Sequence, residues 1–79
     1  MAVVKVLLPQ WGMGMSEGTI VSWLKGVGDR VAEDDPLAEV EAEKVTEELT
    51  APASGTISQI LVEAGETVAV RTAVALIET

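Results

Sequence analysis

Hydrophobic and polar residues alternate along this chain in short runs that are rich in β-branched side chains. Valine alone accounts for 12 of the 79 residues, and Gly, Asp or Pro separates many of the runs. β-Branched residues pack well on a pleated sheet, and short runs between turn residues are typical of strands. We therefore predict strands at residues 3–8, 19–24, 30–32, 37–42, 46–50, 56–61, 67–70 and 74–78.

The clearest alternation lies in residues 37–43. Ala38, Val40 and Ala42 share one face of this predicted strand, whereas Glu39, Glu41 and Glu43 share the other. We place the small apolar face in the core. The number and spacing of the strands predict an all-β fold, either a sandwich or a flattened barrel.

The chain repeats itself at an offset of 37 residues. Nine of the 25 positions in residues 18–42 are identical to the residue 37 places later, and Gly18-Thr19-Ile20 returns as Gly55-Thr56-Ile57. Neither half is long enough to bury a core alone. We therefore predict one domain, residues 1–79, built of quasi-repeats at about 3–42 and 46–79 that pack around a pseudo-twofold axis.

The first half contains a loop that the second half lacks. Eight residues, 10–17, separate Pro9 from Gly18, whereas only two separate Pro52 from Gly55. The extra residues are rich in glycine and large apolar side chains. Two compatible interpretations follow: the loop covers the edge of the core, or it is a recognition loop of the kind that rigid scaffolds often display.

The segment that joins the halves, residues 41–48, predicts a tight hairpin with one lysine at its tip. This residue, Lys44, is one of three lysines in the chain, and its sequence neighbours include Glu41, Glu43, Glu47 and Glu48. Exposed ion pairs are common and weak, so a solvated lysine that balances carboxylates is the ordinary interpretation. The position at the junction of two symmetric halves favours a functional one.

The pseudo-twofold axis relates these two features. It maps Ala42 onto Thr79, so the hairpin and the C-terminus are expected at opposite ends of the domain. The first strand then runs toward the Lys44 end, which places the loop of residues 10–17 beside Lys44. This geometry suits a module that is tethered at one end and presents a lysine at the other.

Composition removes several classes of function. The chain has 5 Lys+Arg, 13 Asp+Glu and a net charge of -8, with no Cys or His and two aromatic residues, Trp11 and Trp23. It therefore lacks thiol nucleophiles, imidazole bases and most transition-metal ligands. Nucleic acid and membranes are not expected partners. Trp23 is expected either in the core or as a half-exposed lid.

Five segments together resemble the lipoyl domain of 2-oxo acid dehydrogenase complexes. They are residues 18–24 (GTIVSWL), 28–31 (GDRV), 37–41 (LAEVE), 43–45 (EKV) and 51–57 (APASGTI). The resemblance covers essentially the whole chain. It implies a flattened β-barrel of two four-stranded antiparallel sheets with pseudo-twofold symmetry, and lipoic acid in amide linkage to Lys44.

The resemblance also implies a non-catalytic swinging-arm carrier. Lipoyl-Lys44 would carry acyl groups and reducing equivalents between a thiamin-dependent decarboxylase, an acyltransferase core and a dihydrolipoyl dehydrogenase of a 2-oxo acid or acetoin complex. The parent chain would be a dihydrolipoamide acyltransferase, loaded by a lipoate ligase or lipoyl transferase. We expect the bacterial or archaeal cytoplasm, or the mitochondrial matrix of a eukaryote.

Candidate site residues surround Lys44 in the sequence or in the inferred topology. Glu43 and Val45 flank the attachment residue. The candidate partner-recognition residues are Trp11, Gly12, Met13, Gly14, Met15, Glu17, Glu41 and Glu47.

Two alternatives stay open. One is the biotinyl carrier domain of a biotin-dependent carboxylase, although such domains have Met on both sides of their lysine and this chain has Glu43 and Val45. The other is an acidic β-sandwich interaction domain without a cofactor. One departure from the lipoyl pattern is Glu43, where that family usually has Asp.

Overall fold

The computed structural model describes residues 2–43 and 45–79, which form eight β-strands. Each strand matches a predicted one to within two residues at either end, because turn residues bound the β-branched runs on both sides. The strands are β1 (Val3–Leu7), β2 (Glu17–Trp23), β3 (Arg30–Val31), β4 (Pro36–Ala42), β5 (Val45–Thr50), β6 (Gly55–Ile60), β7 (Thr67–Ala69) and β8 (Ala73–Glu78).

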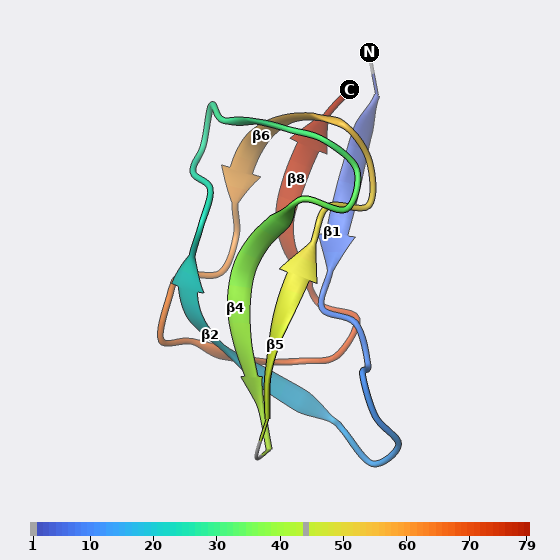
Figure 1. The fold of residues 1–79 in the computed structure, drawn as a ribbon, viewed down its shortest axis with the longest axis vertical. Helices are drawn as coiled ribbons and strands as arrows, with labels where there is room; N and C mark the ends of the chain where they lie inside the picture. The colour runs from blue at the N-terminus through green and yellow to red at the C-terminus, as the bar shows by residue number, and fades with distance from the viewer. Residues whose placement is uncertain (1, 44) are drawn as a thin grey trace.

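Within these described residues the strands form two four-stranded antiparallel sheets. One has the order β1-β8-β6-β3 and the other the order β5-β4-β2-β7. The predicted all-β fold of two four-stranded sheets is therefore confirmed (Figure 1). Each sheet takes two strands from each half of the chain, so the halves are interlaced.

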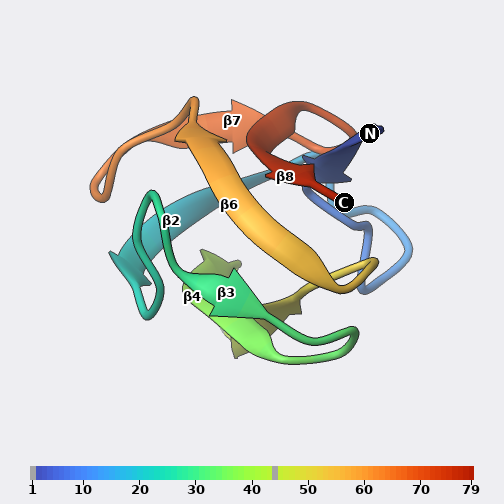
Figure 2. The same ribbon diagram turned by 90° about the horizontal axis from the view of Figure 1, so that it is seen from above.

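The core lies between the two sheets, which curve around it (Figure 2). Leu8, Ile20, Leu37, Ile57 and Ile77 have no exposed surface, and the buried residues of the described chain are all apolar. The predicted inward face of β4 is confirmed as well. Its three small apolar residues are buried, whereas its glutamates are half-buried or exposed.

Equivalent turns in the two halves each donate a backbone hydrogen bond to an interior strand of the opposite half, β6 or β2. The backbone N–H of Gly28 donates to the carbonyl of Ile57 at 2.8 Å, and that of Gly65 donates to the carbonyl of Ile20 at 2.6 Å. Both glycines have a φ of 93°, a backbone conformation that residues other than glycine rarely adopt. These contacts lock the halves together through their backbones.

Trp23 resolves as a half-buried lid. Its ring packs against the core, and its Nε1 donates to the carbonyl oxygen of Val62 at 2.9 Å. A buried indole usually finds a partner for its N–H group, and this one joins the end of β2 to the segment after β6.

The chain termini and the β4–β5 connection lie at opposite ends of the molecule (Figure 1). The N–H of Thr79 donates to the carbonyl of Ala2 at 2.9 Å, which holds the described ends together. The predicted placement of the hairpin and the termini at opposite ends is therefore confirmed. None of the described segments is a helix long and apolar enough to cross a membrane.

The interlaced packing predicts an intolerance to any side chain at Gly55. A Cβ built there would lie 2.7 Å from Cγ2 of Ile77 on the neighbouring strand β8. We expect Gly55→Ala to cost about 1–3 kcal/mol through overpacking. Thermal unfolding should show a midpoint lowered by about 4–8 °C for each kcal/mol.

Gly12→Ala is the matched control, because a Cβ there meets no heavy atom of the described residues within 4 Å. Its unfolding free energy should change by less than about 0.5 kcal/mol. Equal melting temperatures for the two variants would contradict the close approach of β6 and β8.

Candidate functional site

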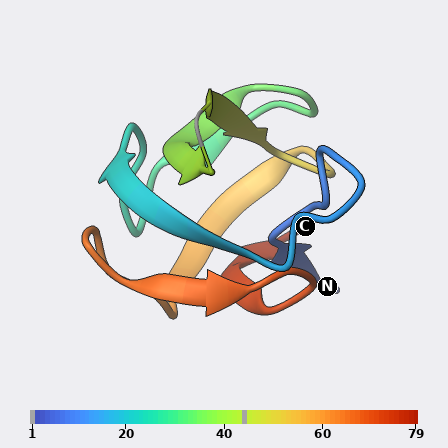
Figure 3. The same cartoon turned by 90° about the horizontal axis from the view of Figure 1, so that it is seen from below.

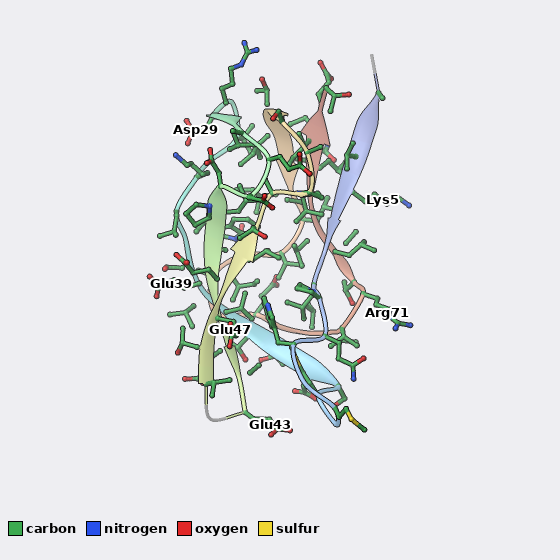
Figure 4. The ribbon with its side chains drawn as sticks, turned by 45° about the vertical axis from the view of Figure 1, so that its right-hand side comes forward. Lys5, Asp29, Glu39, Glu43, Glu47 and Arg71 are labelled. Atoms are coloured by element: carbon green, nitrogen blue, oxygen red, sulfur yellow. The ribbon has the colours of Figure 1, made fainter. Side chains whose placement is uncertain are left out.

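A two-residue turn joins β4 to β5. Ala42 pairs with Val45, so the connection consists of Glu43 and Lys44. Two-residue hairpins favour turns whose first central residue has a positive φ, and Glu43 has a φ of 54°. Lys44, the predicted attachment residue, lies outside the described residues, but both of its neighbours are placed. Figure 4 shows Glu43 at the extremity of the molecule.

The core holds this turn in place. β4 lies between β5 and β2, and its pairing with β5 is regular from Ala38 through Ala42. Val40 has no exposed surface, and Ala42, the last residue before the turn, is also buried. Because the register of β4 is fixed by its buried face, the position of the turn follows from core packing.

A cleft of about 210 Å³ lies between the turn and the extra loop of the first half. The loop contributes one wall and the β4–β5 hairpin the other. Figure 3 views the molecule from the end at which both segments lie, in agreement with the predicted topology. The lining residues are Trp11, Gly12, Met13, Met15, Ala42, Glu43, Val45 and Glu47.

The loop divides into an anchored part and an exposed part. Met15 is buried in the core, Trp11 is half-buried against it, and Nε2 of Gln10 donates to the carbonyl of Met15 at 3.1 Å. Met13 is fully exposed, and Gly14, with a φ of 86°, turns the chain between the two methionines. The interpretation of the loop as a cover for the edge of the core is therefore confirmed for Trp11 and Met15, and recognition by its exposed part stays a prediction.

Three predicted recognition residues, Gly14, Glu17 and Glu41, are not among the described residues that line the cleft. Glu17 begins β2 and Glu41 lies on the outer face of β4, and both are exposed. Glu47 is half-buried and does line it. Sequence reasoning did not identify Ala42 as a residue of the cleft. Alternation places Ala42 in the core, and it does not show that the core opens into a cleft at the end of β4.

Carboxylates dominate the surface of β4 and β5. Glu39 lies directly across from Glu48 in the register of these strands, and Figure 4 shows Glu39, Glu43 and Glu47 along this hairpin. Like charges directly opposite each other on neighbouring strands are destabilising, so Glu39 and Glu48 repel each other across the hairpin. No group of His, Cys, Asp or Glu within the described residues has an arrangement that could hold a metal ion.

These features define a class of protein. They are a small two-sheet barrel and a two-residue turn, with one lysine in its sequence, at the end remote from the described termini. The chain belongs to the family of biotin- and lipoyl-attachment domains: the Biotin_lipoyl family model, described as "Biotin-requiring enzyme", matches residues 4–77.

The chain is similar to parts of several components of 2-oxo acid dehydrogenase complexes. It is 45% identical over 76 residues to the dihydrolipoyllysine-residue acetyltransferase component of the pyruvate dehydrogenase complex of Corynebacterium glutamicum. It is 40% identical over 79 residues to the lipoamide acyltransferase component of the branched-chain alpha-keto acid dehydrogenase complex of Bacillus subtilis. It is also 43% identical over 75 residues to the pyruvate dehydrogenase E1 component subunit beta of Rhizobium meliloti.

The aligned region is nearly all of this chain but a small part of each relative. It covers 96%, 100% and 94% of this chain in these three comparisons, and 11%, 19% and 16% of the respective relatives. The relatives therefore contain much more than this domain.

Solved structures agree on the fold. The lipoyl domain of the 2-oxoglutarate dehydrogenase complex from Azotobacter vinelandii superposes with a TM-score of 0.74 at 26% identity, covering 100% of this chain and 98% of that one. Urea carboxylase from Kluyveromyces lactis superposes with a TM-score of 0.82 at 24% identity, covering 99% of this chain and 6% of that one. The second likeness concerns the fold alone. Family, relatives and fold confirm the predicted class, a non-catalytic carrier domain of the lipoyl type.

The left-handed backbone of Glu43 predicts opposite effects for two glycine substitutions. Left-handed conformations cost residues other than glycine about 1–2 kcal/mol, so Glu43→Gly should raise the free energy of unfolding by up to about 1 kcal/mol. Glu41→Gly, in the extended strand β4, should lower it by about 0.5–1 kcal/mol. Urea unfolding of the two variants measures both. A loss of stability in Glu43→Gly would contradict the turn geometry.

Proposed function

We propose that this domain carries lipoic acid in amide linkage to Lys44 and presents it to the active sites of a 2-oxo acid dehydrogenase complex. The observation that carries the proposal is the two-residue turn between Ala42 and Val45, at the end of the molecule remote from its termini. An arm attached there projects away from the point at which a longer chain would continue.

The residues around the turn fit such a group. Glu43 and Val45 are exposed, so an attaching enzyme has access to both sides of the lysine. The adjoining cleft offers Trp11 and Met13 as apolar surface against which an arm can rest. When bound, a lipoyl group supplies a reducible disulfide that accepts an acyl group and electrons.

The chain's own residues contribute position and charge. The paired strands β4 and β5 fix the turn, and amide formation at Lys44 removes a positive charge from a surface that already contains Glu43 and Glu47. A partner with a basic rim is therefore favoured by electrostatic complementarity. Tethering keeps the arm at millimolar effective concentration near each active site.

The parent protein and its partners follow from the relatives by analogy. Two of the relatives described above are acyltransferase components, so we propose that the domain belongs to a dihydrolipoamide acyltransferase. Its partners are then a thiamin-dependent decarboxylase, the acyltransferase core and a dihydrolipoyl dehydrogenase, with a lipoate ligase or lipoyl transferase as the loading enzyme. Relatives of similar identity act in pyruvate and branched-chain complexes, so the proposal is for the 2-oxo acid class.

Substitution of the attachment residue tests the proposal directly. Lys44→Arg should abolish lipoylation by a lipoate ligase. It should change the free energy of unfolding by less than about 0.5 kcal/mol, because it keeps the charge and both placed neighbours, Glu43 and Val45, are exposed. Intact mass spectrometry after incubation with ligase and lipoate measures the modification. Lys5→Arg and Lys25→Arg are the controls and should be lipoylated like the native domain.

Three outcomes separate the alternatives. A lipoyl mass shift that is lost only in Lys44→Arg supports the proposal. A shift that appears only with a biotin ligase and biotin identifies a biotinyl carrier, and no shift with either enzyme identifies an interaction domain without a cofactor.

The exposure of the loop residues predicts which of them the decarboxylase contacts. Met13 is fully exposed and lines the cleft, whereas Met15 is buried. Met13→Ala should leave lipoylation and the melting temperature unchanged and slow reductive acylation by the cognate decarboxylase severalfold. Leu61→Ala, a truncation of an exposed apolar residue outside the described cleft, should leave both rates unchanged. Native acylation of the Met13 variant would show that the decarboxylase reads another surface.

A further inference from the structure

We propose that the cleft between the loop and the hairpin is a docking site for the dithiolane ring of the arm carried on the same domain. This proposal rests on the proposed function, because it requires lipoylation of Lys44. It adds a resting position for the arm between its visits to partner active sites.

The cleft adjoins the turn that contains the proposed attachment residue, and this favours the arm itself as the occupant. Glu43 and Val45 line the cleft, and they are the immediate sequence neighbours of Lys44. A group tethered between them begins beside the cleft, so tethering gives it a high local concentration there. The opposite wall, Trp11 to Met15, supplies the surface that the ring would contact.

The volume suits a small head group. Pockets that enclose drug-sized ligands measure about 300–1,000 Å³, whereas this cleft measures about 210 Å³. It is therefore smaller than the sites that enclose drug-sized ligands. A five-membered ring at the end of a thin, flexible chain is of the appropriate size.

The chemistry of the lining matches the ring. Trp11, Met13 and Met15 contribute an aromatic face and two thioethers, and sulfur makes favourable contacts with aromatic rings. The arm is uncharged once its amide is formed, so Glu43 and Glu47 at the cleft do not repel it. The fully exposed Met13 gains from any apolar group that covers it.

Weak binding is sufficient for this role. Short tethers give effective concentrations in the millimolar range, so a cleft with a dissociation constant of similar size would be occupied about half of the time. The arm would then remain free to leave for a partner. A much tighter site would conflict with delivery.

Nuclear magnetic resonance of three forms of the domain tests the proposal. The forms are unmodified, lipoylated, and octanoylated on Lys44, the last having a similar chain without the sulfurs. Intact mass confirms the modification of each sample. The reporters are the indole N–H of Trp11 and the methyl groups of Met13 and Met15. The indole of Trp23, which donates to Val62 away from the cleft, is the internal control.

Lipoylation should shift the three cleft reporters, leave Trp23 unchanged, and give cross-relaxation between the ring protons and the indole of Trp11. Octanoylation should give shifts severalfold smaller. Met13→Ala, at an exposed position that the fold does not require, should reduce the cross-relaxation at Trp11 severalfold.

Two results would overturn the proposal. A lipoylated domain whose Trp11 and methionine signals match the unmodified form has no docked ring, and equal shifts from the octanoyl and lipoyl arms would contradict the assignment of the cleft to the dithiolane. Neither result affects the carrier function. A sample that shows no lipoyl mass would instead overturn the proposed function itself.

Discussion

The rest of the structure depends on the interlacing of two half-chains that cannot fold alone. Each half supplies two strands to each sheet, and the buried residues Ile20 and Ile57 hold equivalent places in the two halves. Turn glycines of one half bond to the central strand of the other. A 79-residue chain has little core to spare, so this shared core imposes a single arrangement on both halves.

That arrangement determines the position of the turn between β4 and β5 relative to the chain ends. The connection between the halves falls at one end of the barrel, and the described chain ends meet at the other. Because β4 is an interior strand with a buried face, its last residue, Ala42, is fixed, and Glu43 is held in a left-handed conformation beyond it. The extra loop of the first half then lies beside this turn, with Met15 anchored and Met13 free. A rigid platform with an adjoining cleft is the consequence.

The sequence alone predicted the strands and the placement of the hairpin and the termini at opposite ends of the barrel, because both predictions rest on patterns visible in the sequence. Alternation in β4 and the repeated Gly-Thr-Ile segments are sufficient for that. The sequence did not separate the roles of Met13 and Met15, because two methionines in one glycine-rich loop have the same composition, and only the turn at Gly14 distinguishes them. The strained backbone of Glu43 and the place of Ala42 in the cleft were also beyond reach, since both depend on tertiary packing. The assignment of lipoic acid to Lys44 came from the resemblance and from the position of one lysine in the inferred topology.

The proposed function requires that the folded barrel, and not the local sequence alone, presents Lys44 to its loading enzyme. The most direct measurement compares the rate of lipoylation of the intact domain with that of a peptide of residues 36–50, which contains the whole β4–β5 hairpin sequence. An isolated two-stranded hairpin is marginally stable at best, so the peptide does not hold the folded arrangement. We therefore expect rapid lipoylation of the domain and a rate that is lower by orders of magnitude for the peptide. Equal rates, read by intact mass, would show that the enzyme reads the sequence around Lys44 and would contradict the role assigned to the fold.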